Sequence, residues 1–275
     1  MMEKVRQWYY SLPLHWRKRF RKLIYYPTDL VTSRPSHIPA KGINFTGPGD
    51  FEKIGNEFFQ YFRKWGNITP HSNILEIGCG MGRMALPFKN FLSEEGHFTG
   101  IDIVPEGIAW CREKIAPVDQ RFDFVLADIR NDLYNPDGKT AAGQYTFPFA
   151  GNSFDLIFLT SVFTHLLPSA TERYISEISR LLKPDGRMIA TFFLLDTESQ
   201  KLVRNKKSHF NFKAINAGYA TISSDVPESN VAYEQDWLLS LLQQQGLSLA
   251  EPVKYGSWCG RKEHVSFQDI VIATK

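Results

Sequence analysis

Cysteine is scarce in this chain of 275 residues: the only three are Cys79, Cys111 and Cys259, and no two of them form a C-x-x-C pair. An odd number of widely spaced cysteines argues against a disulfide framework and against a zinc site. No apolar run approaches the roughly 18 residues that a membrane-spanning helix needs. No apolar stretch with a small-residue cleavage site follows the basic N-terminus. These absences predict a cytoplasmic protein with no secretory signal and no metal centre.

Charge of one sign is concentrated in one part of the chain. The formal net charge is +3, but residues 1–34 hold eight Lys and Arg against two acidic residues, which gives +6 there and leaves −3 for the remainder. A slightly acidic body is not typical of a nucleic-acid-binding domain. We therefore expect no nucleic-acid partner, and we assign the basicity to one terminal element.

That terminal element has the pattern of an amphipathic helix over residues 12–26, LPLHWRKRFRKLIYY. Trp16, Phe20 and Leu23 recur at helical spacing with basic residues on the opposite side, and Pro27 is expected to end the helix. Two interpretations stay open. The helix packs on the domain, or it lies on an anionic membrane surface with its aromatic side down and makes a peripheral membrane contact.

Strand-like and helix-like segments alternate after an amphipathic helix that begins at Phe51. This alternation is typical of a parallel sheet covered by helices on both faces. The expected strands are 73–78, 97–103, 122–127, 154–160 and 187–195, and the expected helices are 82–93, 105–116 and 168–182.

The end of the chain departs from that alternation. A predicted helix at about 234–245 is followed by two strand-like segments, 247–255 and 267–275, with no helix between them. Two strands joined without a crossover helix are expected to pair antiparallel. The sequence therefore predicts a C-terminal hairpin at the edge of the sheet.

The chain divides into two expected parts. Residues 1–50 are a basic helix followed by a connector rich in proline and glycine. Residues 51–275 form one domain, in which a segment at about 197–232 interrupts the pattern. We interpret that segment as an inserted lid.

A glycine-rich turn, LEIGCGMGRMA, occupies residues 75–85 between the first predicted strand and the next predicted helix. Gly78, Gly80 and Gly82 permit tight turning and let a ligand lie against the main chain. The N–H groups at the start of the expected helix favour an anionic group. Because ligands of doubly wound sheets bind beyond the carboxyl ends of the strands, this turn is the predicted ligand site.

Acidic residues accompany the turn. Asp102 closes the second strand twenty residues beyond Gly82, where a carboxylate can accept hydrogen bonds from both hydroxyls of a ribose. Asp128 ends the third strand, where it can accept from an adenine amino group while Ile129 offers its backbone N–H. Glu76 lies inside the first strand, where an unpaired carboxylate is costly, so we expect a partner for it.

A dinucleotide site would also use a glycine turn and an acid. Its pattern, G-x-G-x-x-G/A, would place the last small residue at Arg83, a long cation. Glu76 would also repel a pyrophosphate. A nucleoside joined to an amino acid fits better, because its ammonium group suits Glu76. The same reasons disfavour a nicotinamide-dependent oxidoreductase.

Five motifs occur in order: LEIGCGMGRMA, GIDI, LADI, FPFAGNSFDLIFLTSVFTHL and RLLKPDGRMIATF. They resemble the successive motifs of the class I S-adenosylmethionine-dependent methyltransferases, over residues 51–195. The resemblance implies a Rossmann-like, doubly wound α/β fold with a seven-stranded, mostly parallel sheet and S-adenosyl-L-methionine as cofactor. Carried over by position, it implies a cofactor site made of Glu76, Gly78, Gly80, Gly82, Asp102, Ile103, Asp128, Ile129 and Thr160.

Methyl transfer depends mostly on alignment of the reactants and exclusion of water, so a general base is optional. His165, after the fourth strand, is the candidate catalytic base; the alternative is a histidine that caps a helix or shapes the pocket. Trp258 and Arg261, in the exposed-looking turn YGSWCGR, are candidate substrate-binding residues, and the alternative is a packed turn. Phe45 and Asp50 are candidates to fold over the cofactor.

These patterns predict a methyltransferase that acts on a small-molecule acceptor at oxygen, nitrogen or carbon, such as a natural product or a lipid-like intermediate. An aromatic-rich chain with an inserted lid suits a partly apolar acceptor. The fourth strand ends in LTSV and not in the N/D-P-P tetrapeptide of amino-group nucleic-acid methyltransferases. The alternative function is a non-catalytic S-adenosylmethionine-binding scaffold.

Overall fold

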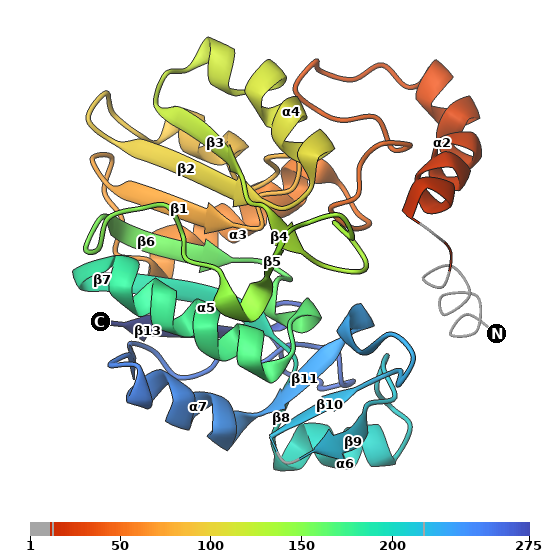
Figure 1. Ribbon diagram of the computed structural model, residues 1–275, viewed down its shortest axis with the longest axis vertical. Coiled ribbons are helices and arrows are strands. Elements are labelled where there is room, and N and C mark those ends of the chain that lie inside the picture. The colour runs from red at the N-terminus through yellow and green to blue at the C-terminus, as the bar shows by residue number, and fades with distance from the viewer. Residues whose placement is uncertain (1–11, 13, 217) are drawn as a thin grey trace.

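A seven-stranded sheet forms the centre of the computed structural model, which describes residues 12, 14–216 and 218–275 (Figure 1). The strand order is β12-β13-β7-β6-β1-β2-β3. The strands are β1 (Asn73–Ile77), β2 (His97–Asp102), β3 (Phe122–Leu126), β6 (Phe154–Leu159), β7 (Leu182–Phe192), β12 (Ser248–Leu249) and β13 (Asp269–Thr274).

Five strands of this sheet, β1, β2, β3, β6 and β7, run parallel, whereas β13 pairs antiparallel with β7 and β12 antiparallel with β13. The predicted mostly parallel sheet and its antiparallel C-terminal hairpin are confirmed. The first strand of the hairpin is shorter than expected. After Ala250, whose N–H donates to Ile272 O at 3.0 Å, the chain pairs with β13 again at an isolated bridge between Lys254 and Ile270.

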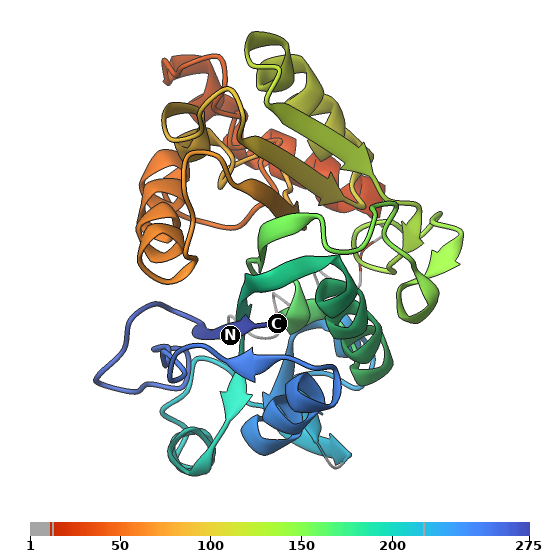
Figure 2. The same ribbon diagram turned by 90° about the vertical axis from the view of Figure 1, so that its left-hand side faces the viewer.

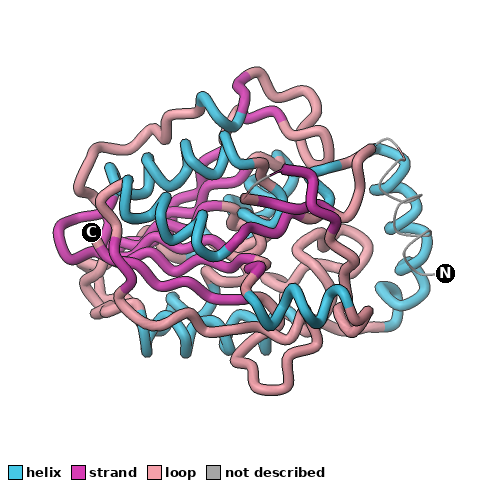
Figure 3. Tube along the Cα trace, turned by 90° about the horizontal axis from the view of Figure 1, so that it is seen from below, coloured by secondary structure: helices cyan, strands magenta, loops and turns pink. Residues whose placement is uncertain are grey.

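Helices cover both faces of the sheet (Figure 3). One core lies between the sheet and α3 and α4, and a second lies between the sheet and α5 and α7. The helices are α2 (Leu14–Val31), α3 (Phe51–Trp65), α4 (Pro105–Lys114), α5 (Pro168–Leu181), α6 (Thr197–Arg204) and α7 (Gln235–Gln244).

The two cores follow from the period of a strand, because consecutive side chains point to opposite faces of a sheet. In β6, Leu156 and Phe158 join the core under α3 and α4, while Ile157 and Leu159 join the core under α5 and α7. All four side chains are completely buried. A strand that is apolar at every position is therefore the sequence counterpart of a sheet covered on both sides.

The segment after the glycine turn differs from the prediction. Residues 80–85 form turns, and a 3₁₀ helix, η1 (Leu86–Asn90), follows them. The hydrogen bonds join residues three apart, from Gly82 N–H to Cys79 O (2.8 Å) and from Ala85 N–H to Gly82 O (3.2 Å). Pro87 has no N–H group to continue an α-helical pattern. The predicted α-helix over 82–93 is therefore wrong, and the anion-binding argument from its dipole does not apply.

The segment between β7 and α7 is itself folded. It contains α6 and a four-stranded sheet in the order β8-β11-β10-β9. Figure 2 shows these elements with α7 at the end of the molecule opposite β3. The strands are β8 (Leu194–Leu195), β9 (Lys213–Asn216), β10 (Tyr219–Thr221) and β11 (Val231–Glu234).

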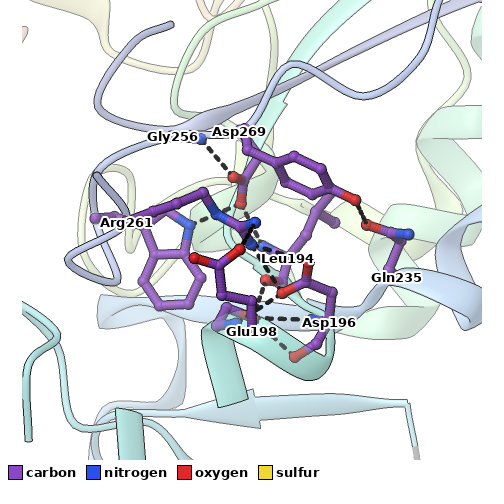
Figure 4. Close-up of polar contacts among 10 residues, drawn as sticks. Leu194, Asp196, Glu198, Gln235, Gly256, Arg261 and Asp269 are labelled. Carbon is purple, nitrogen blue, oxygen red and sulfur yellow. Dashed lines mark hydrogen bonds and ion pairs between the residues drawn. The ribbon is translucent and has the colours of Figure 1, made fainter. Parts of the chain in front are cut away.

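Asp269, the first residue of β13, fastens this small sheet to the main sheet (Figure 4). Its Oδ2 accepts hydrogen bonds from the N–H of Leu194 and the indole N–H of Trp258, and its Oδ1 accepts from the N–H of Gly256, each at 2.7 Å. Burial raises the pKa of Asp269 to about 6, although these donors and the Arg261 charge lower it. Three chain segments distant in sequence thus meet at one carboxylate.

Helix α2 continues to Val31, with Pro27 inside it, so the predicted end at Pro27 is wrong. Proline removes one helical hydrogen bond but leaves later ones intact, and Thr32 N–H donates to Thr28 O at 3.0 Å. Asp29, in the last turn, accepts from the backbone N–H groups of Lys41 and Gly42, which ties this turn to the connector. In the part of the chain that the structure describes, no helix combines the length and apolarity needed to cross a bilayer.

Gly82 allows a test of how the turn is packed. A Cβ at Gly82 would lie 2.3 Å from Cδ1 of Ile115, whereas a Cβ at Gly246 would meet nothing within 4 Å; the φ angles are 77° and 75°. We expect Gly246→Ala to lower the free energy of unfolding by about 1–2 kcal/mol, because its backbone is left-handed. Gly82→Ala should lose about 1–3 kcal/mol more, because it overpacks the end of α4. Urea denaturation measures both losses, and equal losses would contradict the packing role.

Candidate functional site

One cavity of about 1030 Å³ lies at the carboxyl ends of the parallel strands. These ends point toward the side of the molecule where α2 lies (Figure 1). Strand order reverses between β1 and β6, and the loops that leave these two strands therefore diverge and open a crevice. The residues that follow each strand line it: Gly78 after β1, Ile103 after β2, Ile129 after β3, Thr160 after β6 and Phe193 after β7.

Two of the three predicted glycines face this cavity. A Cβ at Gly78 would lie 2.3 Å from Cγ2 of Val162, and a Cβ at Gly80 would lie 2.5 Å from Cγ2 of Thr46. Their φ angles of 82° and 54° also favour glycine. Both positions therefore leave bare main chain against the cavity, whereas Gly82 packs on α4 and does not line it.

Glu76 is the buried charge of the site. Its side chain is 1 % exposed and lines the cavity, and no described residue donates a hydrogen bond to its Oε2. Burial and the negative charge of Asp102 raise the pKa of Glu76 well above its usual range, while Arg83 lowers it. A buried carboxylate oxygen without a donor is costly. The site therefore suits a ligand with a cationic hydrogen-bond donor.

Arg83 supplies the opposite charge. Its Nη2 donates to the carbonyl of Thr46 at 2.5 Å, and its Nε has no hydrogen-bond partner among the described residues. Burial lowers the pKa of Arg83, and the charge of Glu76 raises it. Both residues line the cavity, so a carboxylate and a guanidinium face one ligand site. The sequence analysis used Arg83 only as evidence against a dinucleotide site and missed its place in the ligand site. The signal that could have shown this was a basic residue directly after the glycine turn.

Asp102 holds the glycine turn in place. Its Oδ2 accepts from Gly80 N–H at 2.7 Å and its Oδ1 from Val104 N–H at 2.8 Å. Burial raises the pKa of Asp102, and these backbone donors lower it. The backbone N–H of Ile103 also acts on this carboxylate, so at least one of its roughly four lone-pair positions remains for a hydroxyl group of a ligand. Asp102 lines the cavity together with Ile103 and Ile129.

The structure does not bring Asp128 to the cavity. Its side chain is exposed, and its Oδ1 accepts from Lys139 N–H at 3.0 Å. After β3 the chain enters a short ladder of β4 (Ile129–Arg130) and β5 (Thr140–Ala141), which turns Asp128 toward residue 139. The Asp128 side chain therefore does not line the cavity in this structure and its adenine contact stays a prediction, whereas Ile129 is buried and lines the cavity.

His165 also lines the cavity. It is the last residue of the 3₁₀ helix η4 (Phe163–His165), which follows β6. Its Nδ1 is 2.8 Å from the carbonyl oxygen of Glu228. Because a carbonyl oxygen only accepts, Nδ1 must carry a proton and donate. This assignment from the hydrogen-bond partner leaves the lone pair of the neutral ring on Nε2.

An aromatic wall continues the cavity beyond β7. The rings of Phe193 and Phe210 are 5.1 Å apart, and that of Phe267 is 6.1 Å from Phe210. Beside them, Ser161 Oγ donates to Gln268 Oε1 at 3.0 Å. None of these residues was predicted as a site residue, and of them only Phe210 falls within the predicted lid, 197–232. Ser161 has a left-handed φ of 59°, a form of backbone strain that is common at functional sites.

The connector contributes to the site through Phe45 and Thr46, which line the cavity. Asp50 does not line it. The Asp50 side chain accepts from Lys53 N–H at 2.8 Å and caps the start of α3. Of the two residues expected to fold over a cofactor, the structure therefore brings only Phe45 to the cavity.

Trp258 and Arg261 do not line the cavity. Trp258 is completely buried and donates to Asp269. Arg261 donates to both oxygens of Asp196 at 2.9 Å and to Glu198 at 2.5 Å. The prediction of an exposed turn that contacts substrate is therefore wrong, because the turn is a packed anchor of the small sheet (Figure 4).

The raised pKa of Glu76 predicts how stability depends on pH. The native state keeps a proton at pH values where the unfolded chain, with a pKa near 4.5, has lost it. The free energy of unfolding therefore falls as pH rises above that value, until the native pKa is passed. Glu76→Gln should be more stable than the wild type at about pH 8, and this gain should shrink toward about pH 4.

Glu177→Gln is the control with the opposite sign. Burial raises the pKa of Glu177, but Arg180 and the N–H of Phe147 together lower it by more than burial raises it. The pKa of Glu177 is therefore below its usual value. The contribution of Glu177 to stability is present above its unfolded pKa and is lost as pH falls. Urea denaturation across this pH range should give Glu177→Gln its largest loss near neutrality. Parallel pH profiles of the two variants would contradict the assignment for Glu76.

Comparison with known proteins finds related methyltransferases, and two of them illustrate the match. Residues 75–190 match the family model described as a methyltransferase domain. Over 154 residues the chain is 27 % identical to phosphoethanolamine N-methyltransferase 2 of Caenorhabditis elegans, covering 55 % of this chain and 30 % of the relative. Over 138 residues it is 29 % identical to a tRNA N(3)-cytidine methyltransferase of Gallus gallus, covering 47 % of this chain and 32 % of the relative. The chain thus spans about a third of the length of these relatives.

The fold is similar to that of an S-adenosylmethionine-dependent methyltransferase from Mesorhizobium loti. The TM-score is 0.54 at 13 % sequence identity, over 80 % of this chain and 98 % of that one. The family match contains the glycine turn and the ends of β1, β2, β3 and β6, which are four of the five strands whose ends border the cavity. Residues 75–190 therefore match the methyltransferase-domain family, and the sheet that contains them has the class I S-adenosylmethionine-dependent methyltransferase fold.

Proposed function

We propose that this protein transfers a methyl group from S-adenosylmethionine to a small, partly apolar acceptor. The observation that carries the proposal is one cavity with two unlike halves. Over β1 to β3 it is lined by a buried acid, a half-buried guanidinium and bare main chain, and beyond β6 and β7 it is lined by a histidine and aromatic rings. Its volume of about 1030 Å³ lies at the upper end of the roughly 300–1,000 Å³ usual for ligand pockets.

The residues of the first half fit the cofactor. Glu76 Oε2, which no described residue pairs, suits its ammonium group, and Arg83 suits its carboxylate. Asp102 has a lone pair for a ribose hydroxyl, and Ile103 and Ile129 offer apolar surface to the adenine ring. The bound cofactor supplies an electrophilic methyl group.

The second half supports binding and orientation of the acceptor. Phe193, Phe210 and Phe267 provide apolar surface and exclude water, while Gln268 and His165 provide polar contacts at the border of the two halves. Holding two reactants in line can lower a barrier by roughly 7–11 kcal/mol. Where the acceptor carries a proton, Nε2 of His165 is the base that this half offers.

Small-molecule acceptors are favoured over nucleic acids. One relative is named a tRNA methyltransferase, so tRNA is a competing acceptor. However, the chain outside residues 1–34 carries a net charge of −3, which opposes binding of a polyanion. An aromatic wall is suited to a compact apolar group.

Donor affinity tests the first half of the site. We expect Glu76→Gln to weaken S-adenosylmethionine binding by about 10- to 100-fold, because a hydrogen bond to a charged group contributes about 1.5–3 kcal/mol. Isothermal titration calorimetry measures this change. Glu177→Gln replaces an equally buried acid on α5 that does not line the cavity and should bind as the wild type does. Equal affinity of Glu76→Gln and wild type would contradict the assignment.

His165 is tested by its rate effect. If Nε2 removes the acceptor proton, His165→Ala should lower kcat by about 100-fold or more, and the rise of kcat with pH should disappear. His71→Ala is the matched control, because this exposed histidine precedes β1 at the amino ends of the parallel strands, opposite the cavity. Retention of the wild-type rate and pH profile would assign His165 to pocket shape alone.

The acceptor class is tested with methyl-labelled S-adenosylmethionine. The protein is incubated with separate small-molecule, lipid, tRNA and protein fractions of cells that produce it. Label in the small-molecule or lipid fraction supports the proposal. Label only in tRNA or only in protein overturns the acceptor class, and donor binding without transfer in any fraction favours the scaffold alternative.

A further inference from the structure

Helix α2 turns its apolar side away from the body of the protein. Leu23, Ile24, Leu30 and Val31 are 70 %, 69 %, 67 % and 84 % exposed. Their spacing places them on one helical face, because residues one, seven and eight apart lie within about a third of a turn of one another. This face is a continuous apolar stripe.

The polar side of α2 holds the helix to the body. Arg17 Nη2 donates to the carbonyl of Leu133 at 2.7 Å, and Lys18 Nζ pairs with Glu106 at 2.5 Å. A surface helix of a globular protein normally buries its apolar side and exposes its charges. The reversed arrangement indicates that the apolar stripe serves a contact outside this chain.

Charge distinguishes between the possible partners. Residues 14–31 carry five Lys and Arg against one Asp, a net charge of +4. Two copies of this face would bring like charges together, which opposes self-association. An anionic bilayer accommodates both the apolar stripe and the positive charge of α2. Its acyl region receives aliphatic side chains, and its headgroups attract Arg19 and Lys22, which are exposed. Tyr26, 62 % exposed, has the amphipathic ring that is enriched at such interfaces.

We propose that α2 docks the protein on an anionic lipid bilayer, with Leu23, Ile24, Leu30 and Val31 in the acyl boundary. The helix also borders the cavity, which Arg21, Ile24 and Tyr25 line. An acceptor held in the bilayer therefore reaches the cavity along α2 without crossing bulk water. This delivery rests on the proposed methyl transfer, whereas the docking does not.

Flotation with extruded vesicles tests the docking. The full chain should bind vesicles of phosphatidylcholine with phosphatidylserine and bind pure phosphatidylcholine much less. Leu23→Glu combined with Val31→Glu should weaken binding to the anionic vesicles by about tenfold or more, because two inserted side chains are replaced by charges that headgroups repel. Leu249→Glu is the matched control, since Leu249 is a 41 % exposed apolar residue on β12 at the far edge of the sheet.

A charge variant separates the contribution of the basic residues to vesicle binding from that of the apolar stripe. Arg19→Glu combined with Lys22→Glu keeps the apolar stripe and should remove the preference for anionic vesicles. Added salt should weaken binding of the wild type more than binding of this variant. An unchanged preference in the charge variant would overturn the role of the basic residues.

Three results would overturn the docking. The wild type does not bind anionic vesicles, the Leu249 control loses as much binding as the stripe variant, or the wild type self-associates without lipid and the stripe variant does not. Calorimetry with S-adenosylmethionine on the same variants should give wild-type affinity, which shows that they fold. Vesicle binding without methyl transfer to any fraction would contradict the proposed function and leave the docking intact.

Discussion

The hydrogen bond from Gly80 N–H to Asp102 Oδ2, at 2.7 Å, is the interaction on which the site depends. It joins the turn after β1 to the end of β2 and fixes a backbone with three left-handed glycines. Only with the turn in this form does bare main chain border the cavity beside Glu76. Asp102 therefore holds the glycine turn in its conformation even when no ligand is bound.

The same site carries an electrostatic cost. Glu76 and Asp102 both have raised pKa values because burial disfavours their charged forms, and the charge of Asp102 raises the pKa of Glu76 further. Arg83 offsets part of this cost, and its own pKa is lowered by burial. A ligand with a cation and an anion would relieve both ends of this arrangement. Protein stability and ligand affinity are thus linked through the same few groups.

The sequence predicted the sheet well because central strands such as β6 are apolar on both sides, a pattern typical of a covered parallel sheet. It failed where a local signal competes with tertiary contacts. Pro27 normally ends a helix, but contacts of Asp29 with the connector stabilise the last turn. Trp258 follows a glycine and a serine in a sequence typical of an exposed turn. Its indole is instead buried and donates a hydrogen bond to the carboxylate of Asp269, eleven positions later. Site residues at strand ends were predictable; the aromatic wall, contributed by segments far apart in the chain, was not.

Asp269 has a consequence for how this protein can diversify. It binds the backbone at Leu194, where the inserted segment begins, and at Gly256, after that segment has ended. The base of the insertion is therefore clamped, while Phe210 and its neighbours lie between the two anchors. Substitutions there can therefore change the shape and polarity of the wall while the base of the insertion and the glycine turn stay in place.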